Sequence, residues 1–215
     1  MAVRVQRQEF PSLSEEWERL LPSCPQPSPF LTPLWQRLWW ETLAPHLDRP
    51  DLLLLAFRQE GRLVGVAPLL RQGQVLSFLG EKDLFDYHDF IVPAGTEGDF
   101  YPALGEALEG LPWEEVRLLS LPEGSPTLRW LPETSSRHGW ACQIEQEDVT
   151  PGLPLPSSWE KYLAGLTKKD RHELRRKARR LQAAARPALL SSQEPEEVVS
   201  RMERFLSLMR LGKEA

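Results

Sequence analysis

The chain has 215 residues, of which 41% are apolar, so it is long enough to fold around a sizeable hydrophobic core. The formal net charge is -5, and no zinc-finger or RNA-binding motif is present, so the composition argues against a nucleic-acid-binding protein. The N-terminus lacks the apolar core of a signal peptide, and no segment has the roughly 18 apolar residues of a membrane span. We therefore expect a cytoplasmic protein with no membrane insertion.

Cysteine and histidine usage gives no sign of a metal site. The two cysteines, Cys24 and Cys142, do not form a CxxC pair and have no histidine at ligand spacing. The sequence therefore predicts two buried or half-buried thiols in a reducing compartment, with no disulfide framework and no bound metal.

Two helices are predicted before the first strand. Ser12 or Ser14 begins a short helix that ends at Leu21, and Thr32 caps a second helix with Pro33 at its first position. Apolar residues recur at helical spacing in this second helix. They are Leu34, Trp35, Leu38, Trp39 and Leu43. The three tryptophans Trp35, Trp39 and Trp40 are interpreted as core residues rather than as the wall of a groove.

From Asp51 onward the pattern changes to short apolar runs separated by turns, which is typical of strands. We predict strands over residues 52–57, 63–70, 74–80, 90–92, 113–121 and 140–149, and helices over residues 98–108 and 125–139. This order predicts an α/β fold, or more strictly an α+β mixed sheet with helices on its faces, that ends near Val149.

The remaining residues contain little strand pattern. Residues 151–156 are Pro-rich and resemble a linker. A short helix follows Ser158, a strand is possible over 188–191, and an amphipathic helix is predicted over 194–211. Its inward side chains are expected to be Val198, Met202, Phe205 and Leu208. Such a segment cannot bury these apolar faces by itself.

One segment, Thr167–Leu181, concentrates positive charge. It has eight Lys and Arg residues and two acidic ones, and Thr167 is placed to cap a single long helix. Leu174, Ala178 and Leu181 form a narrow apolar seam on that helix. The basic surface is either a solvated face or a site for phosphate or another anion, because Arg and Lys both pair with such groups.

Three blocks together resemble the CelD/BcsL-type acetyltransferase-like family, which is related to the Fem-type aminoacyl transferases. The blocks are SPFLTPLWQRLWWE at 28–41, GRLVGVAPLLRQGQVLSFLGEKDLFDYHDFIVPAG at 61–95 and LPSSWEKYLAGLTKKDRHELRRKARRL at 155–181. The family has two GNAT-like acyltransferase folds in tandem. The resemblance implies a first GNAT-like domain over 1–150, the linker over 151–156, and the helical start of a second, truncated GNAT-like domain over 157–215.

The loop before residue 90 is the candidate catalytic site. The family's DYxD motif is matched by Asp86, Tyr87 and Asp89, whereas His88 is outside it. A phenol and two carboxylates suit acceptor binding or proton transfer, but the same aspartates also suit capping of backbone N–H groups. With Asp83, these carboxylates would oppose a pyrophosphate, so we do not expect the first domain to bind acyl-CoA.

The resemblance also implies substrate-binding residues and a reaction. Lys168, Lys169 and Arg171 match the basic segment that engages a phosphate of a nucleotide-linked acceptor in Fem-like relatives. The implied activity is transfer of an acyl group from acyl-CoA to an amine or hydroxyl of a small-molecule, cell-envelope or polysaccharide precursor, with the acyl-CoA residues beyond Ala215 and no metal. The alternative is a non-catalytic binding module whose basic helix docks an anionic partner.

Overall fold

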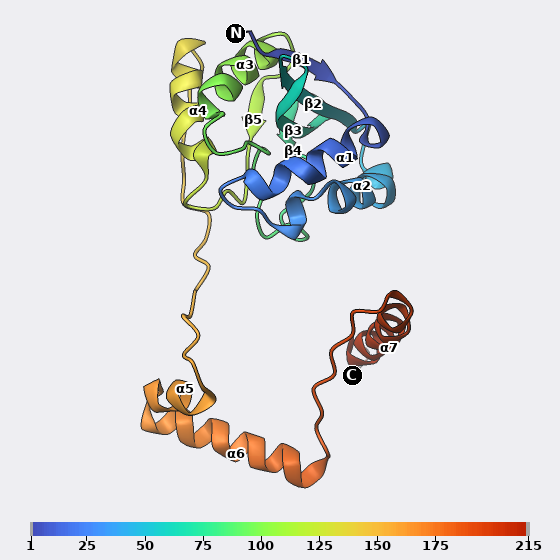
Figure 1. Cartoon of the computed structure of the whole chain (residues 1–215), viewed down its shortest axis with the longest axis vertical. Coiled ribbons are helices and arrows are strands. Elements are labelled where there is room, and N and C mark those ends of the chain that lie inside the picture. The colour runs from blue at the N-terminus through green and yellow to red at the C-terminus, as the bar shows by residue number, and fades with distance from the viewer. Residues whose placement is uncertain (1, 214–215) are drawn as a thin grey trace. The chain divides into compact units, whose positions relative to one another are not determined.

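The computed structural model describes residues 2–213 and divides the chain into two compact units, Met1–Val149 and Thr150–Ala215 (Figure 1). Within the described part of the first unit, the strands are β1 (Arg4–Arg7), β2 (Asp51–Gln59), β3 (Arg62–Gln72), β4 (Val75–Phe78) and β5 (Glu115–Arg117). The α-helices of this unit are α1 (Phe10–Leu20), α2 (Pro33–Thr42), α3 (Glu97–Glu109) and α4 (Pro126–Arg137).

The five strands form one mixed sheet in the order β1-β2-β3-β4-β5. Strands β1 to β4 pair antiparallel with one another in sequence order, whereas β5 pairs parallel with β4, and α3 lies between these two strands in the chain. The predicted mixed sheet is therefore confirmed. Strand β1 was not predicted, because its sequence RVQR is short and mostly charged or polar, as is typical of an exposed edge strand.

Helices cover both faces of this sheet (Figure 1). Alternate residues of β2 belong to different cores: Leu54 and Ala56 pack with α1 and α2, whereas Leu55 and Phe57 pack with α3. A strand that is buried on both faces reads as a continuous apolar run, which explains the sequence LLLLAF. The sheet is thus the middle layer of three.

The strand predicted over 90–92 is reduced to a single bridge between Ile91 and Val66 of β3. Strand β4 ends at Phe78, and the chain leaves the sheet at Gly80 and returns at Ile91. Ile91 pairs with Val66 of β3 through two backbone hydrogen bonds of 2.9 Å. The single bridge shows that residues 80–90 are a loop inserted in the line of β4.

Helix α2 differs from its predicted pattern. Thr32 caps it, since its hydroxyl accepts the N–H of Trp35, and Trp39 is buried as expected. However, Leu34, Trp35 and Leu38 are 53%, 41% and 47% exposed. The buried polar residue of the helix is Gln36, whose side-chain amide donates to the carbonyl of Phe30. The buried face of α2 is therefore narrower than the apolar pattern indicated.

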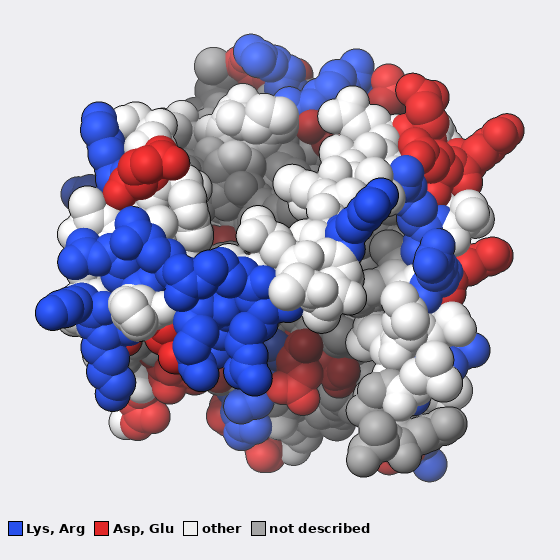
Figure 2. All heavy atoms as spheres, turned by 90° about the horizontal axis from the view of Figure 1, so that it is seen from below, with Lys and Arg blue, Asp and Glu red and all other residues white. Residues whose placement is uncertain are grey.

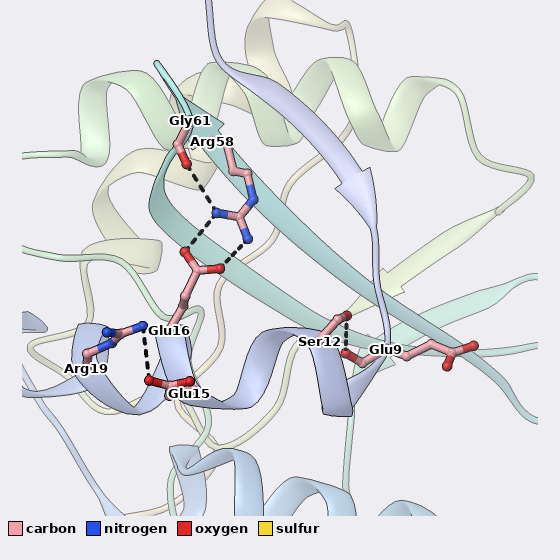
Figure 3. A network of polar contacts seen from close by, with 7 residues as sticks. All are labelled: Glu9, Ser12, Glu15, Glu16, Arg19, Arg58 and Gly61. Atoms are coloured by element: carbon pink, nitrogen blue, oxygen red, sulfur yellow. Dashed lines mark hydrogen bonds and ion pairs between the residues drawn. The ribbon is translucent and has the colours of Figure 1, made fainter.

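A charged pair fastens α1 to the sheet (Figure 3). Arg58 of β2 donates through its two terminal nitrogens to the carboxylate of Glu16, at 2.7 and 2.9 Å, and also to the carbonyl of Gly61 at 3.3 Å. These hydrogen bonds lower the pKa of Glu16 from its ordinary value. The fork of Arg58 thereby links Glu16 of α1 to the end of β2 and to Gly61 of the β2–β3 turn.

Two predicted strands do not form, and the apolar side chains of these segments are exposed. Residues 140–149 are irregular, with Ile144 57% and Val149 67% exposed. Residues 188–191 are also irregular, and Leu189 is fully exposed. An apolar run forms a strand only where a neighbouring strand pairs with it and a core covers it.

The second unit consists of helices and irregular segments in the part that the structure describes. Its helices are α5 (Trp159–Gly165), α6 (Lys168–Ala184) and α7 (Pro195–Lys213), and Thr167 caps α6 as predicted. Among the described residues of these helices, Leu163 is the hydrophobic residue that is buried. The side chains predicted to point inward from α7 are instead exposed: Val198, Met202, Phe205 and Leu208. The apolar faces are thus not covered within this unit.

Helices α3 and α4 contact each other at Gly105, and this contact gives a stability prediction. A Cβ atom at Gly105 would lie 2.6 Å from His138 Nε2 and 2.7 Å from Thr134 Cγ2. Overpacking outweighs the gain in helix propensity, so we expect Gly105→Ala to lower the free energy of unfolding by roughly 1–2 kcal/mol. Chemical denaturation measures this change.

The matched control is Gly98→Ala in the same helix, where the nearest atom would be 3.7 Å away. We expect this variant to change stability by less than about 0.5 kcal/mol. Equal effects of the two substitutions would contradict close packing at Gly105.

Candidate functional site

A cavity of about 210 Å³ lies where three loops of the first unit meet. These loops are the α1–α2 connection, the loop inserted in the line of β4, and the β5–α4 connection. The residues that line the cavity are Gln26, Pro27, Ser28, Leu31, Tyr87, His88, Asp89 and Pro122. Loops held on a rigid sheet are a common location for binding and catalytic groups.

Backbone hydrogen bonds hold the three loops together. The N–H of Ala94 donates to the carbonyl of Ser23 at 3.0 Å, and the N–H of His88 donates to the carbonyl of Ser120 at 2.9 Å. The indole of the fully buried Trp17 donates to the carbonyl of Leu31 at 2.9 Å. The walls of the cavity are therefore tied to α1 and to one another.

Asp89 is the buried charged residue of the cavity wall, with 5% of its surface exposed. Its Oδ1 accepts hydrogen bonds from the hydroxyl of Thr127 at 2.5 Å and from the N–H of Phe90 at 2.8 Å. The hydroxyls of Thr127 and Tyr101 are 2.9 Å apart. Since Thr127 has one proton and donates it to Asp89, Tyr101 must donate to Thr127. The result is a buried chain of hydrogen bonds from Tyr101 through Thr127 to Asp89.

The position of Asp89 sets its protonation. Thr127 lies in the first turn of α4, and Ser125 caps this helix by accepting the N–H of Thr127 at 3.0 Å. A helix N-terminus and hydroxyl donors favour the carboxylate. Burial has the larger effect, so the pKa of Asp89 rises to about 6 despite the hydrogen bonds from Thr127, Ser125 and Phe90. Such a carboxyl group exchanges protons near neutral pH.

His88 lies beside Asp89 and is also buried. Its imidazole stacks between Phe78 and Phe85, with ring centres 5.4 and 4.6 Å away. Burial lowers the pKa of His88 to about 4, so the ring is neutral at pH 7. Among the described residues, no group meets hydrogen-bonding geometry with either ring nitrogen. The backbone of Leu79 is nevertheless near enough to raise the pKa of His88 slightly, against the larger lowering by burial.

The structure brings together two residues of the predicted motif. Tyr87 and Asp89 both line the cavity, whereas Asp86 is exposed and is not one of the lining residues. Asp89 accepts the N–H of Phe90, as the capping interpretation expects, and it also lines the cavity. Sequence analysis did not identify Ser28 or Thr127 as site residues, because only the fold brings them close to the motif. The Ser125-Pro126 helix start was the available signal for this end of α4.

The start of α3 does not fit the pyrophosphate of acyl-CoA. A phosphate site at a helix start needs free backbone N–H groups and no opposing charge. Here Glu97 and Asp99 occupy the first turn, and the N–H of Gly95 already donates to the carboxylate of Glu97 at 2.7 Å. The start of α3 and the acidic loop before it therefore do not suit a pyrophosphate.

The second unit presents the predicted cationic helix. Figure 2 shows a dense cluster of Lys and Arg side chains in one part of the view, besides other basic side chains that lie apart from it. On α6, Glu173 pairs with Arg176 at 2.7 Å and with Lys177 at 3.7 Å. The α6 cations without an ion pair among residues 2–213 are Lys168, Lys169, Arg171, Arg175, Arg179 and Arg180. This surface is suited to an anionic partner.

Arg171 differs from the other cations of this helix because it is half-buried. Its guanidinium donates to the carbonyls of Leu163 and Ala164, at 3.3 and 3.4 Å. Both carbonyls belong to the last turn of α5, where the carbonyl of Leu163 also accepts the N–H of Leu166 at 3.3 Å. The contact favours a structural role for Arg171, whereas Lys168 and Lys169 are exposed.

Other site types find no support in residues 2–213. No group of three or more His, Cys, Asp and Glu residues is placed to hold a metal ion. Cys24 is buried and Cys142 is exposed, and both are free thiols. None of the described helices is both long and apolar enough to cross a bilayer.

Comparison with known proteins gives little. No family model matches the chain, and no curated protein matches it significantly. One solved structure that aligns is a ribosomal-protein-alanine N-acetyltransferase from Brucella melitensis biovar Abortus 2308. The alignment has 15% identity and a TM-score of 0.40, and it covers 71% of this chain and all of that chain. A TM-score this low assigns neither a fold nor an activity.

The raised pKa of Asp89 predicts a pH-dependent stability. The native carboxyl has a pKa of about 6, above the unfolded value of about 3.9, so the native state binds more protons between these values. Its contribution to stability is therefore present below pH 4 and is lost as pH rises to 6, by roughly 2–3 kcal/mol. Urea denaturation of wild type and Asp89→Asn from pH 4 to 7.5 measures it as a difference that changes with pH.

The control is Asp83→Asn, which removes an exposed carboxylate from the same loop. Its stability difference from wild type should stay nearly constant over this pH range. A constant difference for Asp89→Asn as well, or one of the opposite sign, would rule out a buried carboxyl with a raised pKa.

The contacts of Arg171 give a second prediction. Arg171→Ala should remove the guanidinium hydrogen bonds to the last turn of α5 and lower the local stability by about 1 kcal/mol. Hydrogen exchange of the amides of α5 should become several-fold faster. Arg179→Ala, which removes an exposed cation of the same helix, should leave these rates unchanged. If Arg171→Ala also leaves them unchanged, the residue is free for a binding role.

Proposed function

We propose that the chain takes part in transfer of an acyl group from acyl-CoA to an amine or hydroxyl acceptor, and that the cavity at Asp89 binds the acceptor. The element order β1-α1-α2-β2-β3-β4-α3-β5-α4 supports this proposal, because it is similar to the order in one GNAT-like fold. The observation that carries it is a buried carboxyl beside a phenol in a cavity between loops.

Asp89 is suited to take a proton from the acceptor. An amine or hydroxyl attacks a thioester better when a base removes its proton, and a base with a pKa of about 6 accepts that proton near neutral pH. Thr127 and the N–H of Phe90 hold the carboxylate in one orientation. Tyr87, the other motif residue of the cavity, is half-buried and offers a hydroxyl to position the acceptor.

Thiol release from acetyl-CoA in the presence of amine and hydroxyl acceptors tests the proposal. The assay uses the 215-residue chain and, if the gene encodes a longer product, that product as well. We expect acceptor-dependent release that falls at least about 100-fold in Asp89→Asn, the loss typical of removing a general base. Acetyl-CoA affinity, measured by calorimetry, should be unchanged, and Asp83→Asn should behave as wild type.

Absence of both acetyl-CoA binding and thiol release from either protein would refute the proposal. That outcome would favour the alternative function, a non-catalytic binding module. The specific observation behind this alternative is the set of cations on α6 that have no ion pair in the described structure. Under it, an anionic partner occupies the exposed face that includes Lys168 and Lys169.

A further inference from the structure

Helix α7 carries an apolar stripe that is exposed in the described structure. The residues of this stripe recur at intervals of four, three and four residues, which is the spacing of a coiled-coil seam. They are Val198, Met202, Phe205 and Met209, and their exposed fractions lie between 39% and 55%. We call this stripe the α7 seam. A seam of this kind packs against another helix with the same spacing.

The composition of α7 makes a covering partner necessary for a stable helix. Val198 and Val199 are β-branched, which lowers helix propensity. Most helical stability in proteins comes from packing of an apolar face rather than from propensity. Full burial of a side chain such as Phe205 or Met202 contributes roughly 1.5–3 kcal/mol. The α7 seam therefore has the properties of an interface.

The charges of α7 change sign along its length. Glu196 and Glu197 lie in its first turn, whereas Arg204 and Arg210 lie in its second half and are exposed. Glu197 pairs with Arg201 of the same helix. Glu196, Arg204 and Arg210 form no ion pair within residues 2–213. The acidic end and the basic end can thus both pair with a second helix.

This order of charges is complementary to itself when two copies of α7 run in opposite directions. Antiparallel pairing about the middle of the seam brings Glu196 near Arg210 of the second copy, and the same contact recurs at the other end. Parallel pairing would instead bring like charges together at both ends, which is unfavourable. The charge pattern therefore specifies both the partner and its direction.

A membrane surface suits α7 less well than a second helix does. Helices that lie on a bilayer carry an excess of Lys and Arg on their polar face. From Glu196 to Arg210, α7 has three acidic residues and three Arg residues. This balance gives no attraction to anionic lipids.

We propose that two copies of the chain associate through antiparallel pairing of their α7 helices, with the α7 seam of each copy in the interface. The proposal is independent of acyl transfer, because it concerns no residue of the cavity at Asp89 and none of the cations of α6.

Sedimentation equilibrium of the full chain over a range of concentrations tests the association. We expect a mass that rises to twice the 24.7 kDa of one chain. Met202→Lys should weaken dimerisation at least about ten-fold, because it buries an unpaired charge in the seam. The matched control is Ser200→Lys, which adds the same charge on the opposite face of α7 and should leave the dissociation constant within about two-fold of wild type.

Three results would overturn the association. They are a monomer at every concentration, a dimer that Met202→Lys leaves intact, and equal effects of the two substitutions. Vesicles of anionic phospholipid that bind a monomeric chain through α7 would likewise overturn it, in favour of a membrane surface.

Spin labels determine the direction of the two helices. In a Cys142→Ser background, the label is placed at Glu196→Cys or at Glu203→Cys, two positions seven residues apart on one face of α7. Antiparallel pairing offsets the two labels at position 196 by about 22 Å along the helix axis and those at 203 by only about 2 Å. The measured separation should therefore be longer for 196 than for 203. Equal separations would show parallel pairing and overturn the proposal.

Discussion

The buried carboxyl group of Asp89 connects a loop and two helices of the first unit through hydrogen bonds. It joins the loop inserted in the line of β4 to the first turn of α4 through Thr127, and Tyr101 of α3 joins the same chain of hydrogen bonds. A buried carboxyl is costly unless donors surround it. The donors therefore stabilise Asp89, and Asp89 in turn holds two helices and a loop in one arrangement.

This arrangement gives the carboxyl group a dual character. The hydrogen bonds from Thr127 and Phe90 favour its charged form, and burial favours its neutral form. The balance places its pKa at about 6, which is compatible with the proton transfer that we propose for it. A structural aspartate at a helix start would not need a cavity beside it, and here Tyr87 and Ser28 share that cavity.

The second unit raises a different question, because its apolar and cationic surfaces are both uncovered. Leu181 and Phe205 are 54% and 55% exposed, and most cations of α6 have no ion pair within the described residues. Exposed apolar faces on helices are typical of surfaces that another structure covers. Arg171 differs from the other α6 cations because its guanidinium donates hydrogen bonds to carbonyls in the last turn of α5.

The sequence pattern was sufficient to predict those helices and strands whose sequence signals lie within a few neighbouring residues. Thr32 and Thr167 cap their helices as predicted, because a cap depends on one side chain and a nearby N–H. The buried run of β2 and the mixed sheet were likewise predictable, since apolar periodicity reports burial directly. The same pattern failed at residues 140–149, where no partner strand pairs with the run.

The candidate site required the tertiary structure. The sequence by itself identified Tyr87 and Asp89 as candidates, but also Asp86, which stays exposed. Only the fold brings Thr127 and Ser28 to Asp89, from segments 38 residues later and about 60 residues earlier in the chain. Burial then decides the protonation of Asp89 and His88, because the cost of charge depends on surroundings that no local pattern contains.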